Sequence, residues 1–385
     1  MLELYDNTLR EGEQSIGISF SKSQKIDILK KQIAAGIKKI EAGFIAVSDY
    51  ERETLKKIAN MDFDARIFSL SRLLKSDIDD VYNIGLRNIT VFTSSSDLLM
   101  EKKLHTTEEE LIEQIKTLVD YCKKKHMYVR FSCEDATNTP KERLIKFYSA
   151  AYENGADYAS VPDTCGIGSP NSIYDLIKTL KSNVKIPFSI HTHNDFGLAL
   201  ANTIAAYNAG VDEVQATING FGERAGNCPL SEVVVAMKQL YNEDMGIDMK
   251  SVVPLSKTVA SYCNYNISPN HPLTGKNVFT CQSGLHVAIM SKDKRCYMPF
   301  DPEIIGRHVK ISFGKQSGKF NIYLLCDMLG ISLDNNQVKK VLERIKELSY
   351  EKKGDVSTEE VIDIIKSKKI QLNSNFTMPR HIYLH

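Results

Sequence analysis

His191 and His193 stand at the end of an apolar run, with Thr192 between them. In an extended strand, residues i and i+2 point to the same side, so both imidazoles can reach one metal ion. A divalent cation also favours a carboxylate ligand, and Glu11 or Asp6, near the first apolar run, can supply it. These residue types predict a metal site with positions left open for substrate oxygens.

The composition restricts the classes of partner. The chain has 385 residues and a net charge of +1, from 49 basic and 48 acidic residues. This balance gives no electrostatic reason to expect nucleic acid or an anionic membrane as a partner. No apolar run reaches the roughly 20 residues of a membrane span, and the first residues lack the pattern of a secretion signal. We expect a soluble, cytoplasmic protein.

The eight cysteines show no CxxC pair. Cys122, Cys263 and Cys326 lie in apolar helical patterns, which is typical of reduced core cysteines and not of a disulfide framework or a zinc ribbon. No Cys-His pair is evident, so we do not expect catalysis by a thiol.

Short β-prone runs alternate with amphipathic helical patterns along the first two thirds of the chain. Eight such runs are found, at 2–5, 39–42, 65–70, 88–92, 127–131, 158–161, 188–190 and 213–217. A helix is predicted to begin at Thr106, with Glu109 completing a capping box. The alternation predicts a parallel (β/α)₈ TIM barrel, an α/β fold. The alternative, a doubly wound open sheet, lacks a Gly-rich turn after the first strand.

Polar clusters follow or end seven of the predicted strands. They contain Arg10 and Glu11; Arg72; Thr93 to Asp97; Ser132, Glu134 and Asp135; Asp163 and Thr164; His191 and His193; and Asn219, Glu223, Arg224 and Asn227. Barrel enzymes keep their catalytic groups at the carboxyl ends of the strands, so these clusters predict one active site.

The strand-helix alternation stops at about residue 242. Helical patterns return at 250–263, 319–329, 336–348 and 357–365, and Ser357 with Glu360 forms another capping box. We therefore expect a catalytic barrel at 1–245 and a smaller, mostly helical region at 246–385. The segment 373–385 has little pattern.

Three motifs resemble the signatures of the isopropylmalate, homocitrate and citramalate synthases. They are Asp6-x-Thr8-Leu9-Arg10-Glu11-Gly12-x-Gln14, His191-Thr192-His193-Asn194-Asp195-x-Gly197-x-Ala199-x-Ala201-Asn202-Thr203 and Asn219-Gly220-x-Gly222-Glu223-Arg224-Ala225-Gly226-Asn227. The resemblance covers residues 1 to about 320. It implies a Claisen-type condensation of acetyl-CoA with a 2-oxo acid, followed by thioester hydrolysis that releases CoA. The enzyme would be an acyltransferase whose acyl group becomes an alkyl group on transfer.

The resemblance also implies roles for individual residues. Glu11, His191 and His193 would hold a divalent cation, Mg²⁺ or Mn²⁺ with Zn²⁺ as the alternative, and Arg10 would stabilise charge on the acceptor ketone. Thr164 matches the family threonine that contacts the substrate carboxylate; alternatively, it is a strand-end hydrogen bonder.

A base for the acetyl-CoA methyl group is needed because that proton is very weakly acidic. The family positions that provide the acid and base groups match Glu134, His286 and Tyr297. In the family, the segment that carries the last two reaches the neighbouring protomer, which implies a homodimer. The chain departs from the family pattern at Cys281, Gln282 and Gly314-Lys315-Gln316-Ser317-Gly318.

The acceptor depends on a few pocket residues. Arg130, beside Ser132, stands where homocitrate synthases pair an arginine with the distal carboxylate of 2-oxoglutarate, and this favours homocitrate synthase. Alternatively, Arg130 is a solvated arginine on an exposed strand face. Leu74, where some homocitrate synthases have a histidine, suits the apolar side chain of 2-oxoisovalerate or pyruvate. Oxaloacetate would make the protein a citrate synthase.

Two other classes compete with a synthase. An acyl-CoA lyase of the same superfold would use a reactive cysteine loop and would not need the segment from His286 to Tyr297. A non-catalytic paralogue would be expected to have lost Arg10, Glu11 or a metal histidine, and all of these are present.

Overall fold

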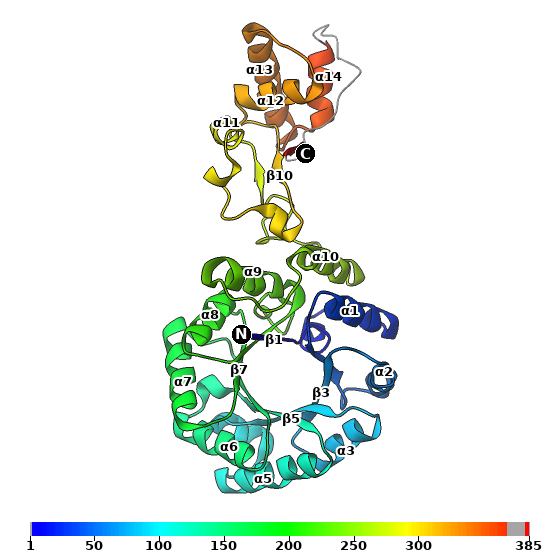
Figure 1. Cartoon of the computed structure of the whole chain (residues 1–385), viewed down its shortest axis with the longest axis vertical. Coiled ribbons are helices and arrows are strands. Elements are labelled where there is room, and N and C mark those ends of the chain that lie inside the picture. The colour runs from blue at the N-terminus through cyan, green and yellow to red at the C-terminus, as the bar shows by residue number, and fades with distance from the viewer. Residues whose placement is uncertain (1, 368–381, 385) are drawn as a thin grey trace. The chain divides into compact units, whose positions relative to one another are not determined.

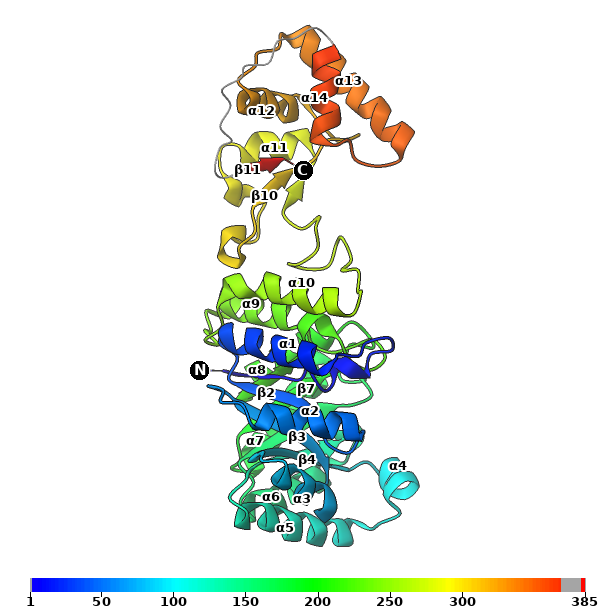
Figure 2. The ribbon, with the colours of Figure 1, turned by 90° about the vertical axis from the view of Figure 1, so that its right-hand side faces the viewer.

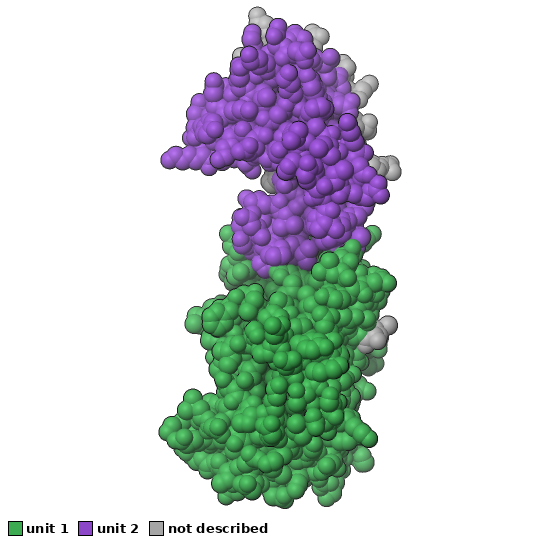
Figure 3. All heavy atoms as spheres, turned by 90° about the vertical axis from the view of Figure 1, so that its left-hand side faces the viewer, with its two compact units in different colours: residues 1–266 green, residues 267–385 purple. Residues whose placement is uncertain are grey.

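The computed structural model describes residues 2–367 and 382–384. The chain divides into two compact units, Met1–Asn266 and Ile267–His385 (Figure 3). None of the described helices combines the length and apolar character needed to cross a lipid bilayer.

The first unit contains a closed barrel of eight parallel strands, as the sequence predicts (Figure 1). The strands are β1 (Glu3–Asp6), β2 (Lys39–Phe44), β3 (Arg66–Arg72), β4 (Asn88–Ser94), β5 (Tyr128–Glu134), β6 (Tyr158–Asp163), β7 (Phe188–Thr192) and β8 (Glu213–Ala216). Each strand pairs with the next along the chain, and β1 pairs with β8 to close the barrel. All eight predicted strands are confirmed, and most extend a few residues further at the carboxyl end.

Helices surround the barrel (Figure 1). They are α1 (Lys22–Ala34), α2 (Asp49–Ala59), α3 (Lys75–Asn83), α4 (Asp97–Leu99), α5 (Glu108–Lys124), α6 (Lys141–Glu153), α7 (Pro170–Asn183), α8 (Ala199–Asn208), α9 (Leu230–Tyr241) and α10 (Val252–Tyr262). Helix α10 lies beyond the boundary expected at residue 245 and packs against α1 and α9. The short α4 and a π-helical segment, Met100–Leu104, form a projection between β4 and α5 (Figure 2).

The alternation of side chains along a strand separates the apolar core from the polar barrel interior. In β5, Val129, Phe131 and Cys133 are fully buried in the core that the helices share with the outside of the barrel. Ser132 and Glu134 point the other way and line a cavity inside the barrel. Because the side-chain period of a strand is two, the same element supplies both core and site.

Helix α5 begins one residue later than predicted. Thr107, and not Thr106, is the N-cap, and its capping box is completed by Glu110 instead of Glu109. The amphipathic character predicted for the helices is confirmed here, because Leu111, Ile115 and Val119, one turn apart on the same face, are buried in the barrel core.

The second unit contains helices and a small parallel sheet. Its elements are β9 (Thr280–Cys281), α11 (Gly284–Met290), β10 (Val309–Ile311), α12 (Lys319–Leu329), α13 (Asn335–Lys352), α14 (Thr358–Ser367) and β11 (Ile382–Leu384). Helices α12, α13 and α14 and the Ser357–Glu360 capping box agree with the prediction, whereas α11 was not predicted. The sheet, in the order β11-β10-β9, was not predicted. Most of the segment 373–385 lies outside the described residues.

Candidate active site

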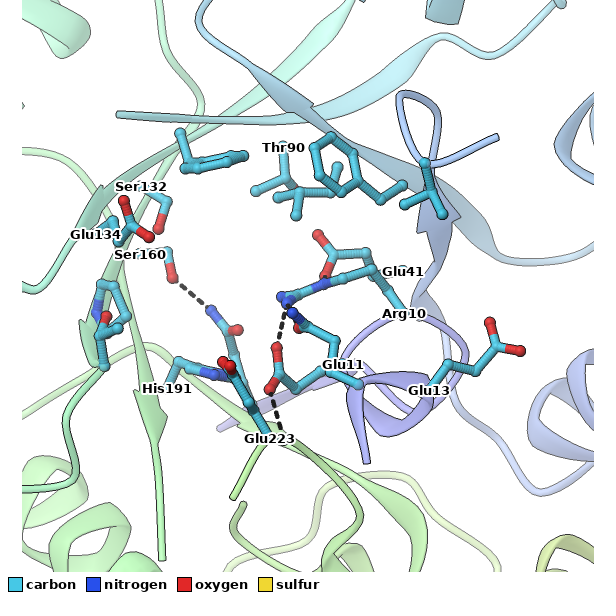
Figure 4. A pocket seen from close by; sticks show the side chains of 18 of the residues that line it. Arg10, Glu11, Glu13, Glu41, Thr90, Ser132, Glu134, Ser160, His191 and Glu223 are labelled. Atoms are coloured by element: carbon cyan, nitrogen blue, oxygen red, sulfur yellow. Dashed lines mark hydrogen bonds and ion pairs between the residues drawn. The ribbon is translucent and has the colours of Figure 1, made fainter. Parts of the chain in front are cut away.

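A cavity of about 580 Å³ lies among the carboxyl ends of the barrel strands and the segments that follow them. In Figure 4, Ser132, Glu134 and Ser160 line one side of it, and Arg10, Glu11 and Glu41 lie across from them. Seven predicted site residues line this cavity: Arg10, Glu11, Ser132, Glu134, Thr164, His191 and His193. The barrel therefore brings together residues that are up to 183 positions apart in the sequence, from Arg10 to His193.

Glu11, His191 and His193 form a compact group of donor atoms. One ligand atom from each lies within 4.8 Å of the others, and all three residues are buried. The two Nε2 atoms are 3.2 Å apart, and Oε1 of Glu11 is 3.8 Å from Nε2 of His193. Imidazole nitrogens and a carboxylate oxygen at this spacing fit a divalent cation.

The charge state of the two imidazoles also fits metal binding. Burial lowers the pKa of His191 well below its ordinary value, and the neighbouring His193 and Arg10 lower it further. Burial lowers the pKa of His193 as well, although Glu11 opposes this shift. Both rings are therefore neutral at pH 7, and a neutral imidazole has a nitrogen lone pair available for a metal.

Arg10 is held beside the donor group by two carboxylates. Its Nε donates to Oε2 of Glu41 at 2.6 Å, and its Nη1 donates to Glu11. Glu41 is fully buried in β2 and also accepts from Nδ2 of Asn7 at 2.8 Å and from the Tyr5 hydroxyl at 3.2 Å. These contacts fix the positively charged guanidinium of Arg10 at the edge of the predicted metal site.

Glu134 lies at the end of β5, on the cavity wall. Its carboxylate accepts hydrogen bonds from the Ser94 hydroxyl and from Nζ of Lys103, at 2.6 Å to Oε2 and 2.9 Å to Oε1. The Thr164 hydroxyl accepts a hydrogen bond from the backbone N–H of Asp135 at 2.9 Å. Thr164 is thus a strand-end hydrogen bonder that also lines the cavity, and its own hydroxyl proton remains available to donate.

Arg130 does not line the cavity, which corrects the role expected for it. Its side chain is fully buried in the barrel interior, nearer the amino ends of the strands, and forms a bidentate ion pair with Glu213. The guanidinium carbon lies 3.8 Å from the centre of the Tyr5 ring, and Tyr5 itself lines the cavity. Arg130 is therefore neither the expected carboxylate-binding residue nor a solvated surface residue.

The position expected for Leu74 is also corrected, and the choice left open between Asp6 and Glu11 as the carboxylate of the donor group falls on Glu11. Leu74 is the N-cap of α3, is 41% exposed and is not among the residues that line the cavity. Asp6 is buried, and its Oδ1 accepts from the backbone N–H of Thr8 at 2.8 Å and from Nε2 of Gln32 at 2.7 Å. Its carboxylate is thus used in folding the first loop, and Glu11 provides the carboxylate of the donor group.

His286 and Tyr297 lie in the second unit, outside the barrel that holds the other site residues. Their rings are stacked, with centroids 4.1 Å apart and planes inclined by 26°. Tyr297 is 43% exposed. The two residues expected to act as a pair are therefore neighbours on the surface of this unit.

Three residues that contact members of the site were missed or left without a role. Glu41 is a lone acidic residue in the apolar run of β2, and its inward position in the alternation would have indicated a buried ionic partner. Asn227 belongs to the third motif, and its Nδ2 lies 3.1 Å from Nε2 of His191. Lys103 gave no signal in the sequence beyond a pair of adjacent lysines.

Comparisons with known proteins identify the family and the fold. Residues 1–259 match the model of the HMGL-like family, and residues 273–353 match the homocitrate synthase post-HMGL domain-like family. The HMG-CoA lyase of Pseudomonas aeruginosa has the same fold, with a TM-score of 0.63 and 18% identity over 76% of this chain and 98% of that chain.

Archaeal synthases are similar over most of the chain. Homocitrate synthase AksA of Methanopyrus kandleri is 38% identical over 90% of this chain and 87% of its own length. The 2-isopropylmalate synthase of Methanocaldococcus jannaschii is 39% identical over 90% and 67%, and the (R)-citramalate synthase CimA of the same organism is 37% identical over 90% and 71%. The chain therefore belongs to the HMGL-like family, among the homocitrate, isopropylmalate and citramalate synthases.

Proposed function

We propose that this protein condenses acetyl-CoA with a 2-oxo acid, in a metal-dependent reaction that releases CoA. The observation that carries the proposal is the buried donor group of Glu11, His191 and His193, which lines the same cavity as Arg10 and Glu134. The similar archaeal proteins are synthases, and the match of residues 273–353 to a homocitrate synthase domain supports a synthase over a lyase.

Glu11, His191 and His193 would hold the cation, and we propose Mg²⁺ or Mn²⁺, with Zn²⁺ as the alternative. When bound, such a cation polarises the ketone of a 2-oxo acid as a Lewis acid. Arg10 would stabilise the negative charge that develops on the ketone oxygen as the new carbon–carbon bond forms. Because Glu41 already holds the guanidinium, this stabilisation needs little rearrangement during the reaction.

Glu134 would act on the acetyl-CoA methyl group from the opposite wall of the cavity. Ser132 and Thr164 carry hydroxyl groups that line the same cavity and would bind the carboxylate of the acceptor. His286 and Tyr297 would complete the acid and base groups. Their stacked, partly exposed rings suit a pair that works on a ligand bound by another surface.

We propose that these two residues are supplied by a partner subunit in a homodimer. Exposed apolar side chains lie on five of the connections that follow barrel strands: Ile16, Val47, Leu98, Ile167 and Phe196. In the second unit, Leu285 and Ile289 are exposed on α11 on either side of His286. Apolar groups gathered on a surface in this way favour burial against another protein surface.

The acceptor we propose first is 2-oxoglutarate, which would make the protein a homocitrate synthase. The support is the homocitrate synthase domain match and the similarity to AksA proteins. The position of Arg130 removes the residue that the sequence suggested for a distal carboxylate.

An acceptor with a small apolar side chain, 2-oxoisovalerate or pyruvate, is the second candidate. Phe44, Leu70 and Phe92 form an apolar part of the cavity, with the Phe44 and Phe92 rings 6.0 Å apart. Among the described lining residues, the two cations Arg10 and Lys103 are both paired with glutamates. A distal carboxylate would have to displace one of these pairs.

The proposed reaction is tested by measuring CoA release from acetyl-CoA with 2-oxoglutarate, 2-oxoisovalerate, pyruvate and oxaloacetate, each with Mg²⁺ or Mn²⁺. We expect CoA release that depends on a 2-oxo acid, and the preferred acid decides between the two acceptor candidates. Activity that instead cleaves a 3-hydroxyacyl-CoA, with no condensation in any of the four mixtures, would make the protein a lyase and overturn the proposal.

A further inference from the structure

The carboxylate of Glu134 is held by side chains from the connection between β4 and α5. Nζ of Lys103 donates to both carboxylate oxygens, at 2.6 and 2.9 Å, and the Ser94 hydroxyl donates to Oε2. Lys103 belongs to the π-helical segment Met100–Leu104, which Met100 anchors through its buried side chain. A π-helical turn is rare, and such turns are frequently found at functional sites.

The backbone of Glu134 is fixed independently. Its carbonyl oxygen accepts from the backbone N–H of Ser95 at 3.0 Å and from the Ser95 hydroxyl at 2.8 Å. The next residue, Asp135, has a φ of 65°, and the Thr164 hydroxyl accepts from its N–H. With the main chain fixed on both sides, the remaining freedom of Glu134 is the rotation of its side chain. The hydrogen bonds from Ser94 and Lys103 restrict that rotation.

The electrostatic surroundings explain why this side chain needs a cation. The cavity is lined by six glutamates: Glu11, Glu13, Glu41, Glu51, Glu134 and Glu223. Arg10 pairs with Glu11 and Glu41, and buried Lys25 pairs with Glu13 and Glu51. Among the described residues that line the cavity, Lys103 is the cation that contacts Glu134.

We propose that Lys103 is a positioning residue, which orients the Glu134 carboxylate toward the acetyl-CoA methyl group. This inference rests on the proposed function, because it assumes that Glu134 takes the methyl proton. Oε2 receives two hydrogen bonds in the described structure, from Ser94 and Lys103, whereas Oε1 receives one, from Lys103. An ionised carboxylate oxygen has two lone-pair sites, so Oε1 keeps one free.

Oε1 of Glu134 is then the atom that accepts the proton. The methyl C–H bond breaks, the proton forms an O–H bond with Oε1, and the electron pair of the C–H bond remains on the substrate as the enolate. If Lys103 were lost, the carboxylate could rotate, and repulsion from the neighbouring glutamates would move it away from this orientation. Small displacements of a catalytic group can cost large factors in rate.

Stability and turnover should respond differently to the loss of Lys103. The Lys103 side chain is 46% exposed and that of Glu134 is 25% exposed, so the ion pair contributes little to folding. A merely structural pair would therefore have almost no measurable effect when broken. A positioning pair would lower kcat in a protein that unfolds at the same temperature as the wild type.

The test compares Lys103→Met with the matched control Lys102→Met and with Lys103→Arg. Lys102 is the adjacent lysine, is 66% exposed at its side chain and pairs with Glu101 instead. We measure kcat, the KM values for acetyl-CoA and for the preferred 2-oxo acid, thermal unfolding, and binding of Mn²⁺ by calorimetry.

We expect Lys103→Met to lower kcat by about ten- to a hundredfold, since the loss concerns orientation of a reacting group. Both KM values and Mn²⁺ affinity should change by less than about twofold, because ground-state binding is untouched. Lys103→Arg should recover part of kcat, and Lys102→Met should behave as the wild type.

An unchanged kcat in Lys103→Met would overturn the inference. A raised KM for a dicarboxylic acceptor at unchanged kcat would also overturn it, because Lys103 would then bind the substrate. These failures are distinct from failure of the proposed function, in which the wild-type protein itself would release no CoA with any 2-oxo acid.

Discussion

The side chains of Arg130 and Glu213 form a bidentate ion pair inside the barrel, with Nη2 2.6 Å from Oε1 and Nη1 3.1 Å from Oε2. Neither side chain is exposed to solvent. The pair therefore lies below the cavity floor, where Tyr5 separates it from any ligand. Removing one partner of a buried ion pair leaves the other charge buried without compensation, which strongly destabilises the fold. We therefore assign the pair a structural role.

Replacing Arg130 by Met should destabilise the protein by about 3 kcal/mol, because Glu213 would keep only its contact with Lys39 at 2.9 Å. The exposed Arg66, also on a barrel strand, provides the matched control, and Arg66→Met should cost less than about 1 kcal/mol. Urea unfolding measures both. The acceptor KM of the folded Arg130→Met enzyme should equal that of the wild type. A tenfold higher acceptor KM with unchanged stability would show that Arg130 binds the substrate after all.

The case of Arg130 shows what the sequence could and could not predict. The alternation in β5 places Arg130, Ser132 and Glu134 on one face, and that face does point into the barrel. The alternation does not say how far a residue lies from the cavity along the barrel axis, because that distance depends on how the strands are staggered. Glu213, the partner of Arg130, begins a strand 83 positions away, and no local pattern indicated this pairing.

Asp6 predicts a measurable pH dependence. Burial raises the pKa of its carboxyl from 3.8 to about 7, although hydrogen bonds from Thr8 and Gln32 oppose the shift. The folded state therefore holds a proton that the unfolded state releases at lower pH. The stabilising contribution is complete below pH 3.8 and is lost as the pH rises through 7.

Asp6→Asn should remove this dependence. An asparagine has no charge to bury, so the variant should be more stable than the wild type by about 2–4 kcal/mol at pH 8, and the difference should shrink toward pH 4. Thermal or urea unfolding of both proteins across this pH range provides the comparison. A difference that stays constant with pH would show that Asp6 does not titrate on folding.

Gly222 predicts a steric effect on the metal site. A Cβ at this position would lie 1.8 Å from Oδ1 of Asn227 and 3.4 Å from Oε1 of Glu11. Gly222→Ala should therefore move the Asn227 amide away from His191 and weaken Mn²⁺ binding by about ten- to a hundredfold, as for other residues that orient metal ligands.

Gly12 is the matched control for Gly222. Its added Cβ would meet Phe221 and Thr8 only at the ordinary contact distance of 3.5 Å, so Gly12→Ala should bind Mn²⁺ as the wild type does. Calorimetric titration of both variants measures the affinities. Equal weakening in the two variants would mean that the metal site is sensitive to a methyl group added in either loop, and that the contact with Asn227 is not the cause.

The remaining differences between prediction and structure also have physical reasons. At the start of α5, the run Thr106-Thr107-Glu108-Glu109-Glu110 offers the capping-box pattern twice. The predicted pair, Thr106 with Glu109, precedes the observed pair, Thr107 with Glu110, by one residue. The sheet of the second unit has strands of two or three residues, which are too short to show alternation. The metal group was predictable because each of its members belongs to a motif at a strand end, and strand ends meet in a barrel.

The most direct test of the account is whether CoA release requires a metal held by His193. The wild-type protein is treated with a chelator and assayed with acetyl-CoA and its preferred 2-oxo acid, and the assay is repeated after Mn²⁺ is restored. His193→Ala is treated in the same way. Calorimetry measures Mn²⁺ binding by both proteins. The account predicts that wild-type activity disappears and returns with Mn²⁺, whereas folded His193→Ala neither binds Mn²⁺ tightly nor releases CoA. Full activity in the chelated wild type, or in His193→Ala, would contradict it.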